Sequence, residues 1–441
     1  MPLPLLGRSR TQSAEEDVEY LEDKIILGWD VSNDCPFIVD VKKTRHFLIV
    51  GLQGSGKSVA LRRISDGYYQ LGYFVDVLND KHGEWEGVTK PNKNYSRMLS
   101  WQKRILRLPV KVFCPVQEEP FGWTNVVRYS PEMCYRNGTK PFSFRITDLS
   151  EADWRVLLAV SRRDYNRQIV WKAFYRHVHR ERRKHPSLVV DEKFIRECVR
   201  SGVLSQYVMF ESQKERLTDE AVEREIEALW EEYLSPDARV FEGEYPRSFI
   251  DMLYDEHGIR RNVIIDWYEF KEGLTWRAEE ARDIYIALML QSLFNWCKEK
   301  HTAGDKTPSV VVLDEAQKIL IGSDDSRDRE SYTRRFLKTV YAEGRKFRQH
   351  VVVACQGDLP KIPSLLYENT DIFLISPKNA NRRSLNFLRE SHPDVFEWSG
   401  DIANFQRLPQ HFFLAIDKHN NELPYSVVLP YPNLSHITGS V

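Results

Sequence analysis

The sequence lacks any run of about 20 apolar residues, the length that a membrane-spanning helix needs. Its opening, MPLPLLGRSRTQSAEED, is too short and too polar for a signal peptide. We therefore expect a chain that is not itself transmembrane. We expect it to work in the cytoplasm, and a peripheral place at a membrane or a virion stays open.

Cysteine and net charge are also scarce. The 6 cysteines are scattered without C-x-x-C spacing, which favours buried reduced thiols over a zinc site or a disulfide framework. The 63 Lys and Arg residues nearly balance the 64 Asp and Glu residues, so the formal net charge is −1. Nucleic-acid binding would therefore depend on local patches, or on an assembly that concentrates them.

The apolar residues that are present form short runs rich in valine and isoleucine. Such runs at 73–78, 110–113, 309–313, 350–355 and 371–375 indicate buried strands, and helical stretches separate them. Between about 148 and 280 this rhythm gives way to helical periodicity. The pattern predicts an α/β fold with a mainly parallel sheet, interrupted by a helical insertion.

The chain of 441 residues exceeds the usual size of one hydrophobic core. We divide it into an N-terminal arm with a short β region (1–45), the first part of the α/β core (46–147), the helical insertion (148–280), the second part of the core (281–408), and a C-terminal hairpin and arm (409–441). The first β region predicts a hairpin that turns at 32–34, and the last one turns at 420–421.

A phosphate-binding motif follows the first strand of the core, in HFLIVGLQGSGKSVAL. The pattern G-x-x-x-x-G-K-[ST] is satisfied, and its glycines let the backbone curl so that N–H groups point inward at a helix N-terminus. We expect Lys57 to neutralise the β- and γ-phosphates and Ser58 to ligate Mg²⁺. The residues predicted to bind ATP here are Gly51, Gly54, Ser55, Gly56, Lys57, Ser58 and Val59.

An acidic pair ends the predicted strand at 309–313, in VVVLDEAQ. Ligands of open α/β sheets lie at the carboxyl ends of the strands. We expect Asp314 to hold the Mg²⁺ with its water shell and Glu315 to activate the attacking water. An acidic pair can instead simply cap the next helix, but the phosphate loop favours the catalytic interpretation.

Other polar residues follow predicted strands. Asp80 and Glu84 come just after the strand at 73–78, in VLNDKHGEW, and we expect them near the nucleotide phosphates. A solvated acidic turn is the alternative. Gln356 ends VVVACQ and could sense the γ-phosphate through its amide, or it could only cap the strand.

One basic segment, AEGRKFRQH, offers a catalytic arginine. Arg345 could reach into the site of a neighbouring subunit and stabilise charge there as an arginine finger. An ordinary surface role is the alternative, because Lys346 and Arg348 flank it. Arg334 or Arg335 could also serve instead.

In this order, GLQGSGKS, DKHGEW, LDEAQ, EGRKF and ACQGDLPKIPSLLYENTDIFLI resemble the HerA/FtsK superfamily of ring-forming, DNA-pumping ATPases, and most closely its HerA branch. The resemblance covers about 26–84 and 309–377 well. It implies a RecA-like P-loop core, a hexamer with ATP bound between subunits, and double-stranded DNA threaded through the pore. About 50 residues precede the phosphate loop, too few for the complete N-terminal β-barrel of that branch, which weakens the expectation of a docked nuclease.

Two segments are candidates for DNA contact. The helical segment RRDYNRQIVWKAFYRHVHRERRKH carries nine lysines and arginines with aromatic residues between them, and such a number could neutralise phosphates without reading bases. Its alternative is a solvated helix whose aromatic residues pack inward. The other candidate is SRDRESYTRRFLK, after the acidic strand, as a loop that lines a pore.

We therefore predict an ATPase that couples ATP hydrolysis to the translocation of double-stranded DNA, in repair, genome packaging or DNA transfer. A nuclease, a viral component or a membrane channel would be its partner. The alternative function is an ATP-dependent assembly switch that does not pump DNA. Glu315 counts against the switch, because a switch needs no strong catalytic base. A kinase fits the acidic strand and the strand ending in glutamine poorly.

Overall fold

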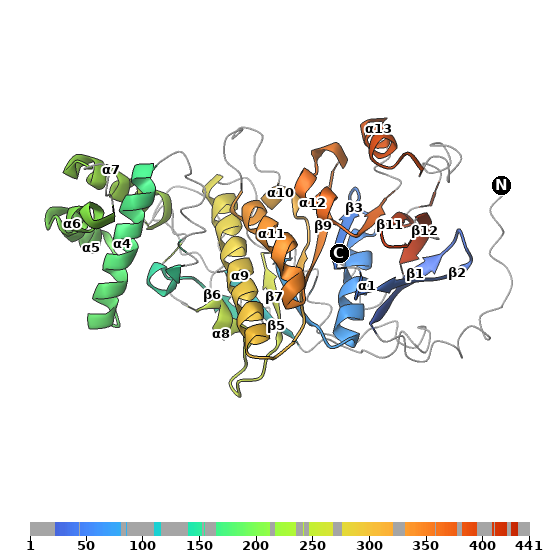
Figure 1. Cartoon of the computed structure of the whole chain (residues 1–441), viewed down its shortest axis with the longest axis horizontal. Coiled ribbons are helices and arrows are strands. Elements are labelled where there is room, and N and C mark those ends of the chain that lie inside the picture. The colour runs from blue at the N-terminus through green and yellow to red at the C-terminus, as the bar shows by residue number, and fades with distance from the viewer. Residues whose placement is uncertain are drawn as a thin grey trace, which may run out of the picture.

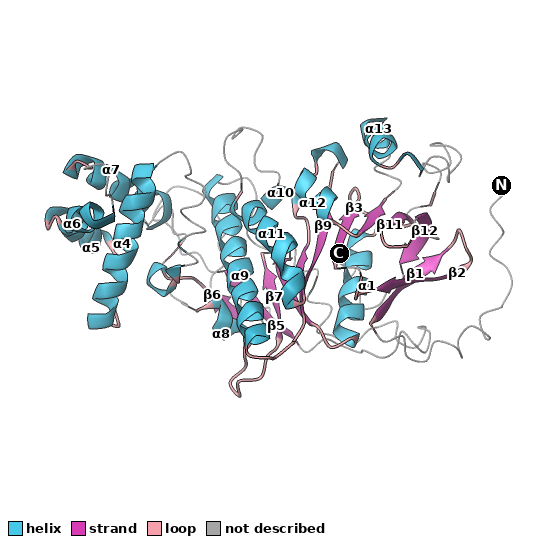
Figure 2. Ribbon diagram, in the orientation of Figure 1, coloured by secondary structure: helices cyan, strands magenta, loops and turns pink. Residues whose placement is uncertain are grey.

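The computed structural model describes 23–43, 45–80, 85, 110–115, 140–151, 154, 165–211, 217–234, 241, 247–267, 276–320, 331–357, 359–376, 382–394, 408–409, 411–420 and 425–430. Within these residues, 12 strands form a single sheet that crosses the molecule (Figure 1). Helices flank this sheet, and a separate group of helices lies at one end (Figure 2). Among the described helices, none is long and apolar enough to cross a membrane.

The strand order across the sheet is β2-β1-β12-β11-β10-β3-β9-β8-β4-β7-β5-β6. The strands from β10 to β6 in this order are parallel, and β2, β1, β12 and β11 extend the sheet in antiparallel fashion. Their bounds are β1 Lys24–Asp30, β2 Cys35–Asp40, β3 His46–Val50, β4 Phe74–Asp80, β5 Val110–Pro115, β6 Lys140–Phe142, β7 Asn262–Asp266, β8 Ser309–Leu313, β9 Gln349–Cys355, β10 Ile372–Ile375, β11 Phe413–Asp417 and β12 Tyr425–Pro430.

The helices and short turns of helix connect these strands. The α-helices are α1 Lys57–Gln70, α4 Tyr165–Lys184, α5 Glu192–Arg200, α6 Val203–Glu211, α7 Asp219–Leu229, α8 Phe249–Leu253, α9 Trp276–Thr302, α10 Gln317–Leu320, α11 Tyr332–Glu343, α12 Ser364–Asn369 and α13 Arg382–Ser391. The short elements are η4 Ile146–Asp148, η5 Trp230–Leu234, η6 Gly344–Phe347 and η7 Leu359–Lys361.

The sheet separates two hydrophobic layers, because alternate residues of each strand point to opposite faces. In β3, Phe47 and Ile49 pack on the layer that contains α1, whereas Leu48 and Val50 pack on the layer that contains α9 and α11. Every residue of β3, β8 and β9 is buried, as expected for parallel strands that are covered on both faces.

Both predicted hairpins are present, and they meet. β1 pairs with β2, β11 pairs with β12, and β1 also pairs with β12, with Gly28 opposite Pro430. The two ends of the described chain therefore extend the same sheet. All five strands predicted from the valine- and isoleucine-rich runs are also present, within one or two residues of the expected ends.

The segment predicted as a helical insertion contains more than helices. Its range includes β7, which lies between β4 and β5 inside the sheet. The helices α4 to α7 form the group at one end of the molecule (Figure 1), and α4 packs on α6 and α7. The strand shows that the chain re-enters the sheet before 280. The rest of the proposed division into domains stays a prediction.

Candidate functional site

Three strand ends lie next to one another at the carboxyl edge of the sheet. β9 lies between β3 and β8 and runs parallel to both, with Val50 opposite Cys355 and Leu313 opposite Val353. Loops that follow parallel strands leave the sheet from the same edge. The phosphate loop after β3, the glutamine after β9 and the acidic pair after β8 are therefore neighbours in space, although they are far apart in the sequence.

The phosphate loop joins β3 to α1. Gly54 and Gly56 have φ angles of 72° and 92°, in the left-handed region that glycine adopts at little cost. α1 begins at Lys57, whose Nζ donates a hydrogen bond to the Leu52 carbonyl at 3.0 Å. The N-cap of α1 is Gly56, which has no side-chain acceptor for the N–H groups of the first turn. The start of α1 therefore offers donors and the positive end of the helix dipole to an anion.

The packing of the loop fits a nucleotide phosphate bound with Mg²⁺. A Cβ on Gly51 would lie 2.2 Å from Ser55 Oγ, so a side chain at this position would force the Ser55 hydroxyl to move. Within the part of the chain that the structure describes, the buried Ser55 Oγ has no hydrogen-bond partner. The Ser58 hydroxyl and the Asp314 carboxylate supply oxygen, and Mg²⁺ is commonly held by one or two carboxylates together with substrate phosphates.

The acidic pair forms a strained turn after β8. Asp314 is buried, and its Oδ1 accepts a hydrogen bond from the Glu315 N–H at 2.8 Å. Glu315 has a φ of 45°, a left-handed conformation that is uncommon outside glycine and that clusters at functional sites. The Ala316 N–H donates to the Ala354 carbonyl at 2.9 Å. The turn is thus fixed against β9.

Gln356, which follows β9, adds a second connection between the ends of β8 and β9. Its N–H donates to Gln317 Oε1 at 2.7 Å, and Gln317 is the first residue of α10, directly after the acidic turn. The Gln356 side chain is half-buried. The ends of β8 and β9 are therefore tied together by both backbone and side-chain hydrogen bonds.

Two charged groups of the site affect the pKa of a buried thiol, Cys355, at the end of β9. Burial raises the pKa of the Cys355 thiol to about 12, the nearby Lys57 ammonium lowers it and the Asp314 carboxylate raises it. Both charged groups must lie close to Cys355 to act on it. The lysine of the phosphate loop and the first carboxylate of the acidic pair therefore both act on the thiol of the strand that lies between them.

Two polar residues beside the acidic turn were missed from the sequence. Asn79 lies at the end of β4, where its Nδ2 donates to the carbonyl oxygen of Asp314. Arg282 of α9 donates from Nε to Asn79 Oδ1 at 2.9 Å. A polar residue ending a buried strand could have marked Asn79. Nothing in the charged run WRAEEARD distinguishes Arg282.

The remaining predicted residues are placed differently. Asp80 is the last residue of β4, the strand next to β8, and its backbone pairs with Asp266 of β7. It therefore lies at the same edge of the sheet as the acidic pair, one strand away. Glu84 lies outside the described residues. Arg345 is exposed on η6, directly before β9 begins. It therefore lies at the opposite edge of the sheet, and the seven residues of β9 separate the two edges by about 20 Å.

Most of the basic segment forms α4, Tyr165–Lys184, whose aromatic residues Trp171 and Phe174 pack inward, and 162–164 lie outside the described residues. Trp171 and Phe174 are buried, and the Trp171 Nε1–H donates to the Glu225 carbonyl of α7 at 3.1 Å. Arg167 forms an ion pair with the Glu225 side chain at 3.1 Å. The exposed basic side chains of α4 are Arg176, Arg180, Arg183 and Lys184. Their spacing of three and four residues places them on one face of the helix.

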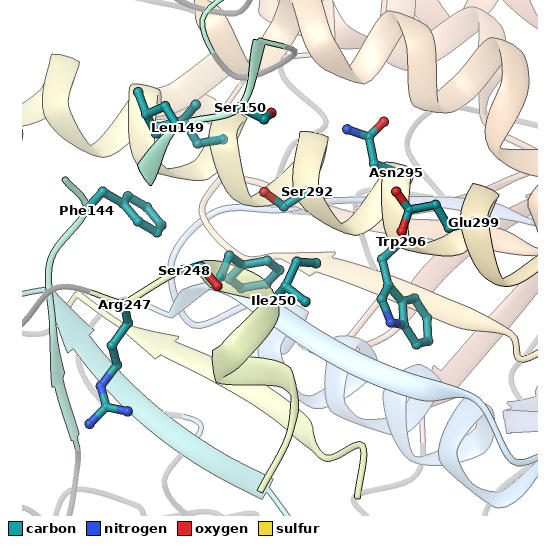
Figure 3. A pocket seen from close by; sticks show the side chains of 12 residues that line it. Phe144, Leu149, Ser150, Arg247, Ser248, Ile250, Ser292, Asn295, Trp296 and Glu299 are labelled. Atoms are coloured by element: carbon teal, nitrogen blue, oxygen red, sulfur yellow. The ribbon is translucent and has the colours of Figure 1, made fainter. Parts of the chain in front are cut away.

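A pocket of about 270 Å³ lies elsewhere, between the chain around η4, α8 and α9 (Figure 3). Ser292, Asn295 and Glu299 of α9 line it together with Phe144, Ser150 and other residues. Of the described residues predicted for the nucleotide site, none lines it. The pocket is therefore separate from that site.

Comparison with known proteins identifies related sequences and folds. The FtsK/SpoIIIE family model matches residues 8–64, which contain β1, β2, β3 and the phosphate loop. This match covers less than half of the chain. No match was found among curated proteins.

Similar solved structures cover nearly the whole chain. The bacterial conjugative coupling protein TrwBdeltaN70, in an unbound form, is 14% identical over 96% of this chain and 92% of that chain, with a TM-score of 0.54. The plasmid coupling protein TrwB in complex with ADP and Mg²⁺ is 13% identical over 96% and 93%, with a TM-score of 0.55. VirB4 of Thermoanaerobacter pseudethanolicus is 12% identical over 92% and 96%, with a TM-score of 0.50. The predicted fold class, a RecA-like core with a mostly parallel sheet, is confirmed.

Proposed function

We propose that this chain, which matches the FtsK/SpoIIIE family model over residues 8–64 and has the fold of TrwB, is a P-loop ATPase of the FtsK/HerA superfamily. It uses ATP to move double-stranded DNA through a ring of six identical subunits. The observation that carries the proposal is the grouping of the phosphate loop, Gln356 and the pair Asp314–Glu315 at three neighbouring strand ends. A site that only held nucleotide would not require the carboxylate after the metal ligand.

Each residue of the site has a separate task in hydrolysis. The N–H groups of the loop and of the first turn of α1 hold the phosphates, and the Lys57 ammonium balances their charge. Glu315 accepts the proton of the attacking water. Ser58 and Asp314 would hold Mg²⁺, which neutralises charge that develops on the phosphate oxygens when it is bound. Gln356, fixed through its N–H to Gln317, directs its amide toward the γ-phosphate.

The nucleotide site is completed by a second copy of the chain. Arg345 lies about 20 Å from the phosphate loop of its own chain, across the length of β9, and it is exposed. It can therefore stabilise the transition state only in an adjoining subunit. Hydrolysis in one subunit would then alter its contact with the next, and a ring would convert this change into movement of DNA.

The basic face of α4, defined by Arg176, Arg180, Arg183 and Lys184, supports contact with DNA phosphates. Such a row of cations binds without reading sequence, and its contribution weakens as salt rises. The segment 326–338 remains the alternative contact; its residues before 331 lie outside the described part of the chain.

The fold shared with TrwB supports DNA transfer as the process, because TrwB is a conjugative coupling protein and has been solved with ADP and Mg²⁺. In this case the partner is a membrane channel, and the ATPase works at the cytoplasmic side. A viral partner in genome packaging or a nuclease in repair would use the same motor.

An assembly switch is the second candidate, because nucleotide binding alone could join copies through Arg345. A switch should hydrolyse ATP at a rate that does not depend on DNA. A motor should hydrolyse faster when duplex is present, since the DNA is its load.

The proposal is tested by measuring ATP hydrolysis with and without double-stranded DNA over a range of salt concentrations, for the wild type and for Glu315→Gln. We expect duplex to stimulate the wild type and salt to reduce the stimulation. Glu315→Gln should bind ATP with unchanged affinity and lose about 100-fold or more in rate, as expected for a lost general base. Lys57→Ala should not bind nucleotide, and Lys298→Ala, at an exposed position of α9, is the control that should behave as wild type.

Images of Glu315→Gln with ATP and duplex should show rings that enclose DNA. Hydrolysis by Glu315→Gln at the wild-type rate would refute the role of the carboxylate. A wild type that hydrolyses ATP, remains indifferent to duplex and never encloses it would favour the switch.

A further inference from the structure

Hydrogen bonds connect α9 to the acidic turn through the end of β4. Arg282 donates from both Nε, at 2.9 Å, and Nη2 to Asn79 Oδ1. Asn79 Nδ2 in turn donates to the Asp314 carbonyl oxygen, and the Asp314 N–H donates back to the Asn79 carbonyl at 3.2 Å. Since a guanidinium can only donate, it fixes which end of the Asn79 amide is oxygen. The NH₂ group is thereby aimed at Asp314.

The arginine is held in place on several sides. It is buried, and its guanidinium carbon lies 5.7 Å from the centre of the Trp267 ring. The Trp267 Nε1–H is itself bonded to the Leu78 carbonyl, one residue before Asn79, at 3.0 Å. The next residue, Asp283, accepts hydrogen bonds from the backbone N–H groups that begin α11. The position of Arg282 is therefore fixed by Asn79 of β4, by Trp267 directly after β7, and by the bonds that join α9 to α11 at Asp283.

We propose that Arg282, acting through Asn79, is a positioning residue for the acidic turn. The inference rests on the proposed ATPase function, because the turn carries the expected metal ligand and the expected base. The two bonds between Asn79 and the backbone N–H and C=O of Asp314 hold this residue in the orientation from which Glu315 adopts its left-handed conformation. Without them, the backbone at Asp314 could rotate, and both carboxylates would leave their places.

A second buried arginine, which bonds to a side chain of the same strand, offers a matched control. Arg260 pairs with Asp76, three residues before Asn79 in β4, and its guanidinium lies over Phe74 and Trp296. Both arginines are buried, both bond to a side chain of β4 and both contact aromatic rings. Arg260 differs in that it bonds near the other end of the strand, away from the acidic turn. A change there should affect folding without affecting the turn.

The sharpest variant is Asn79→Asp. Its carboxylate still accepts from Arg282, with a charge that matches the guanidinium, but it cannot donate to the Asp314 carbonyl. We expect kcat for ATP to fall about 10- to 100-fold, the usual loss when a residue that supports a metal ligand is changed. The KM for ATP should change less than about threefold, because the phosphate loop is intact. Arg282→Lys, which keeps the charge and one donor, should lose less, and Arg260→Lys should keep the wild-type kcat.

A second measurement does not depend on activity. Thermal unfolding is followed with ADP in the presence of Mg²⁺ and with ADP in the presence of a chelator. A ligand that binds the folded state raises the midpoint, so the extra rise with Mg²⁺ reports the metal at the site. This extra rise should be lost or reduced in Asn79→Asp and Arg282→Lys, and it should persist in Arg260→Lys.

The outcomes separate this inference from the proposed function. If the wild type hydrolyses ATP and folded Asn79→Asp and Arg282→Lys match it in kcat and in the Mg²⁺-dependent rise, the positioning role is refuted and the ATPase stands. If Asn79→Asp does not fold, Arg282→Lys decides by the same two measurements. If the wild type itself shows neither hydrolysis nor a rise with ADP and Mg²⁺, the proposed function fails and this inference fails with it.

Discussion

At the scale of single residues, two features of Gly56 disfavour a side chain: its backbone conformation and its contact with His411. Its φ of 92° lies in the left-handed region, and a Cβ at this position would lie 3.0 Å from His411 Nδ1. His411, on the chain that leads into β11, has a φ of 77°. The last glycine of the phosphate loop is thus confined by a residue about 355 positions later in the sequence, a contact that only the assembled sheet creates.

Gly56→Ala should therefore cost more than backbone strain alone. Gly72 provides the control, because it has a φ of 81° and a Cβ added there would meet nothing within 4 Å. We expect Gly72→Ala to lower the free energy of unfolding by about 1–2 kcal/mol. Gly56→Ala should lower it further and weaken ADP binding about tenfold or more, because the loop must shift. Urea unfolding and ADP titration measure the two effects.

Equal costs for the two glycine variants, with unchanged ADP affinity in Gly56→Ala, would show that the loop accommodates the methyl group. The variant His411→Ala in the background of Gly56→Ala gives an independent check. Removing the imidazole should restore part of the lost stability if the contact causes the loss.

Asp66 should give the protein a stability that depends on pH. Burial raises the pKa of this carboxyl to about 7, and the Arg63 guanidinium and the Gln70 side chain oppose the rise. The folded chain then holds a proton that the unfolded chain has released between about pH 4 and about pH 7. The free energy of unfolding should therefore fall as pH rises through this window.

The expected size follows from the two pKa values. Between pH 5 and pH 7, urea unfolding of the wild type should lose about 2–3 kcal/mol more than that of Asp66→Asn, which cannot titrate. Identical pH dependence in the two proteins would mean that the ion pair with Arg63, at 3.1 Å, keeps Asp66 charged throughout.

The residues that could be predicted at this scale belong to short motifs of consecutive residues. The phosphate loop is contained in eight consecutive residues, and the acidic pair directly follows a buried strand, so both are visible in the sequence. Asn79, Arg282 and His411 act through contacts between distant segments. Asn79 is marked only as a polar residue at the end of a buried strand, and the neighbouring residues along the chain do not reveal any of these contacts.

At the scale of elements, the start of α9 organises the start of α11. The buried carboxylate of Asp283 accepts from the Tyr332 N–H at 2.7 Å and from the Thr333 N–H at 2.9 Å. The Thr333 hydroxyl donates to the Asp283 carbonyl at 3.0 Å. One residue of α9 thus satisfies backbone donors that α11 cannot satisfy within its own first turn.

Asp283→Ala should therefore destabilise the fold by about 2–3 kcal/mol, because buried N–H groups lose their acceptor. Asp191, which caps α5 from an exposed position through the Phe194 N–H at 2.8 Å, is the matched control. Asp191→Ala should cost about 1 kcal/mol. Urea unfolding compares the two, and an equal cost would argue that α11 finds other acceptors.

The elements that were predicted and missed differ in their surroundings. The five strands found from the sequence are runs of valine and isoleucine with turns on both sides. β7, Asn262–Asp266, is equally buried, but its three apolar residues stand alone between polar ends, inside a long segment of helical pattern. The pairing that makes it a strand comes from β4 and β5, which are distant in the sequence.

At the scale of the whole molecule, the phosphate loop lies at the carboxyl ends of the parallel strands and Arg345 lies at their amino ends. Arg345 therefore cannot serve the phosphate loop of its own chain, and mixed oligomers test the proposed sharing of the site between copies. Arg345→Ala leaves the phosphate loop intact, and Lys57→Ala leaves Arg345 intact. Each variant alone should be nearly inactive, since an arginine finger contributes about 10³-fold or more.

Mixing the two variants should restore activity. About a quarter of the interfaces in a random equal mixture pair an intact loop with an intact arginine. Lys346→Ala, at the exposed neighbour of Arg345, should be active without mixing. An inactive mixture whose subunits demonstrably exchange would show that Arg345 does not act across the interface, and Arg334 or Arg335 would then be tested in the same way.

The pairing of β1 with β12 has a consequence for how the protein is made. Gly28 and Pro430, which lie opposite each other, are separated by about 400 residues of sequence, so closing this contact comes late on any pathway. During synthesis, β1 and β2 leave the ribosome long before β12, so one edge of β1 has no partner strand until β12 follows. Until then, that edge is open to pairing with another nascent chain. Truncated chains that end before β12 should therefore aggregate rather than remain in solution.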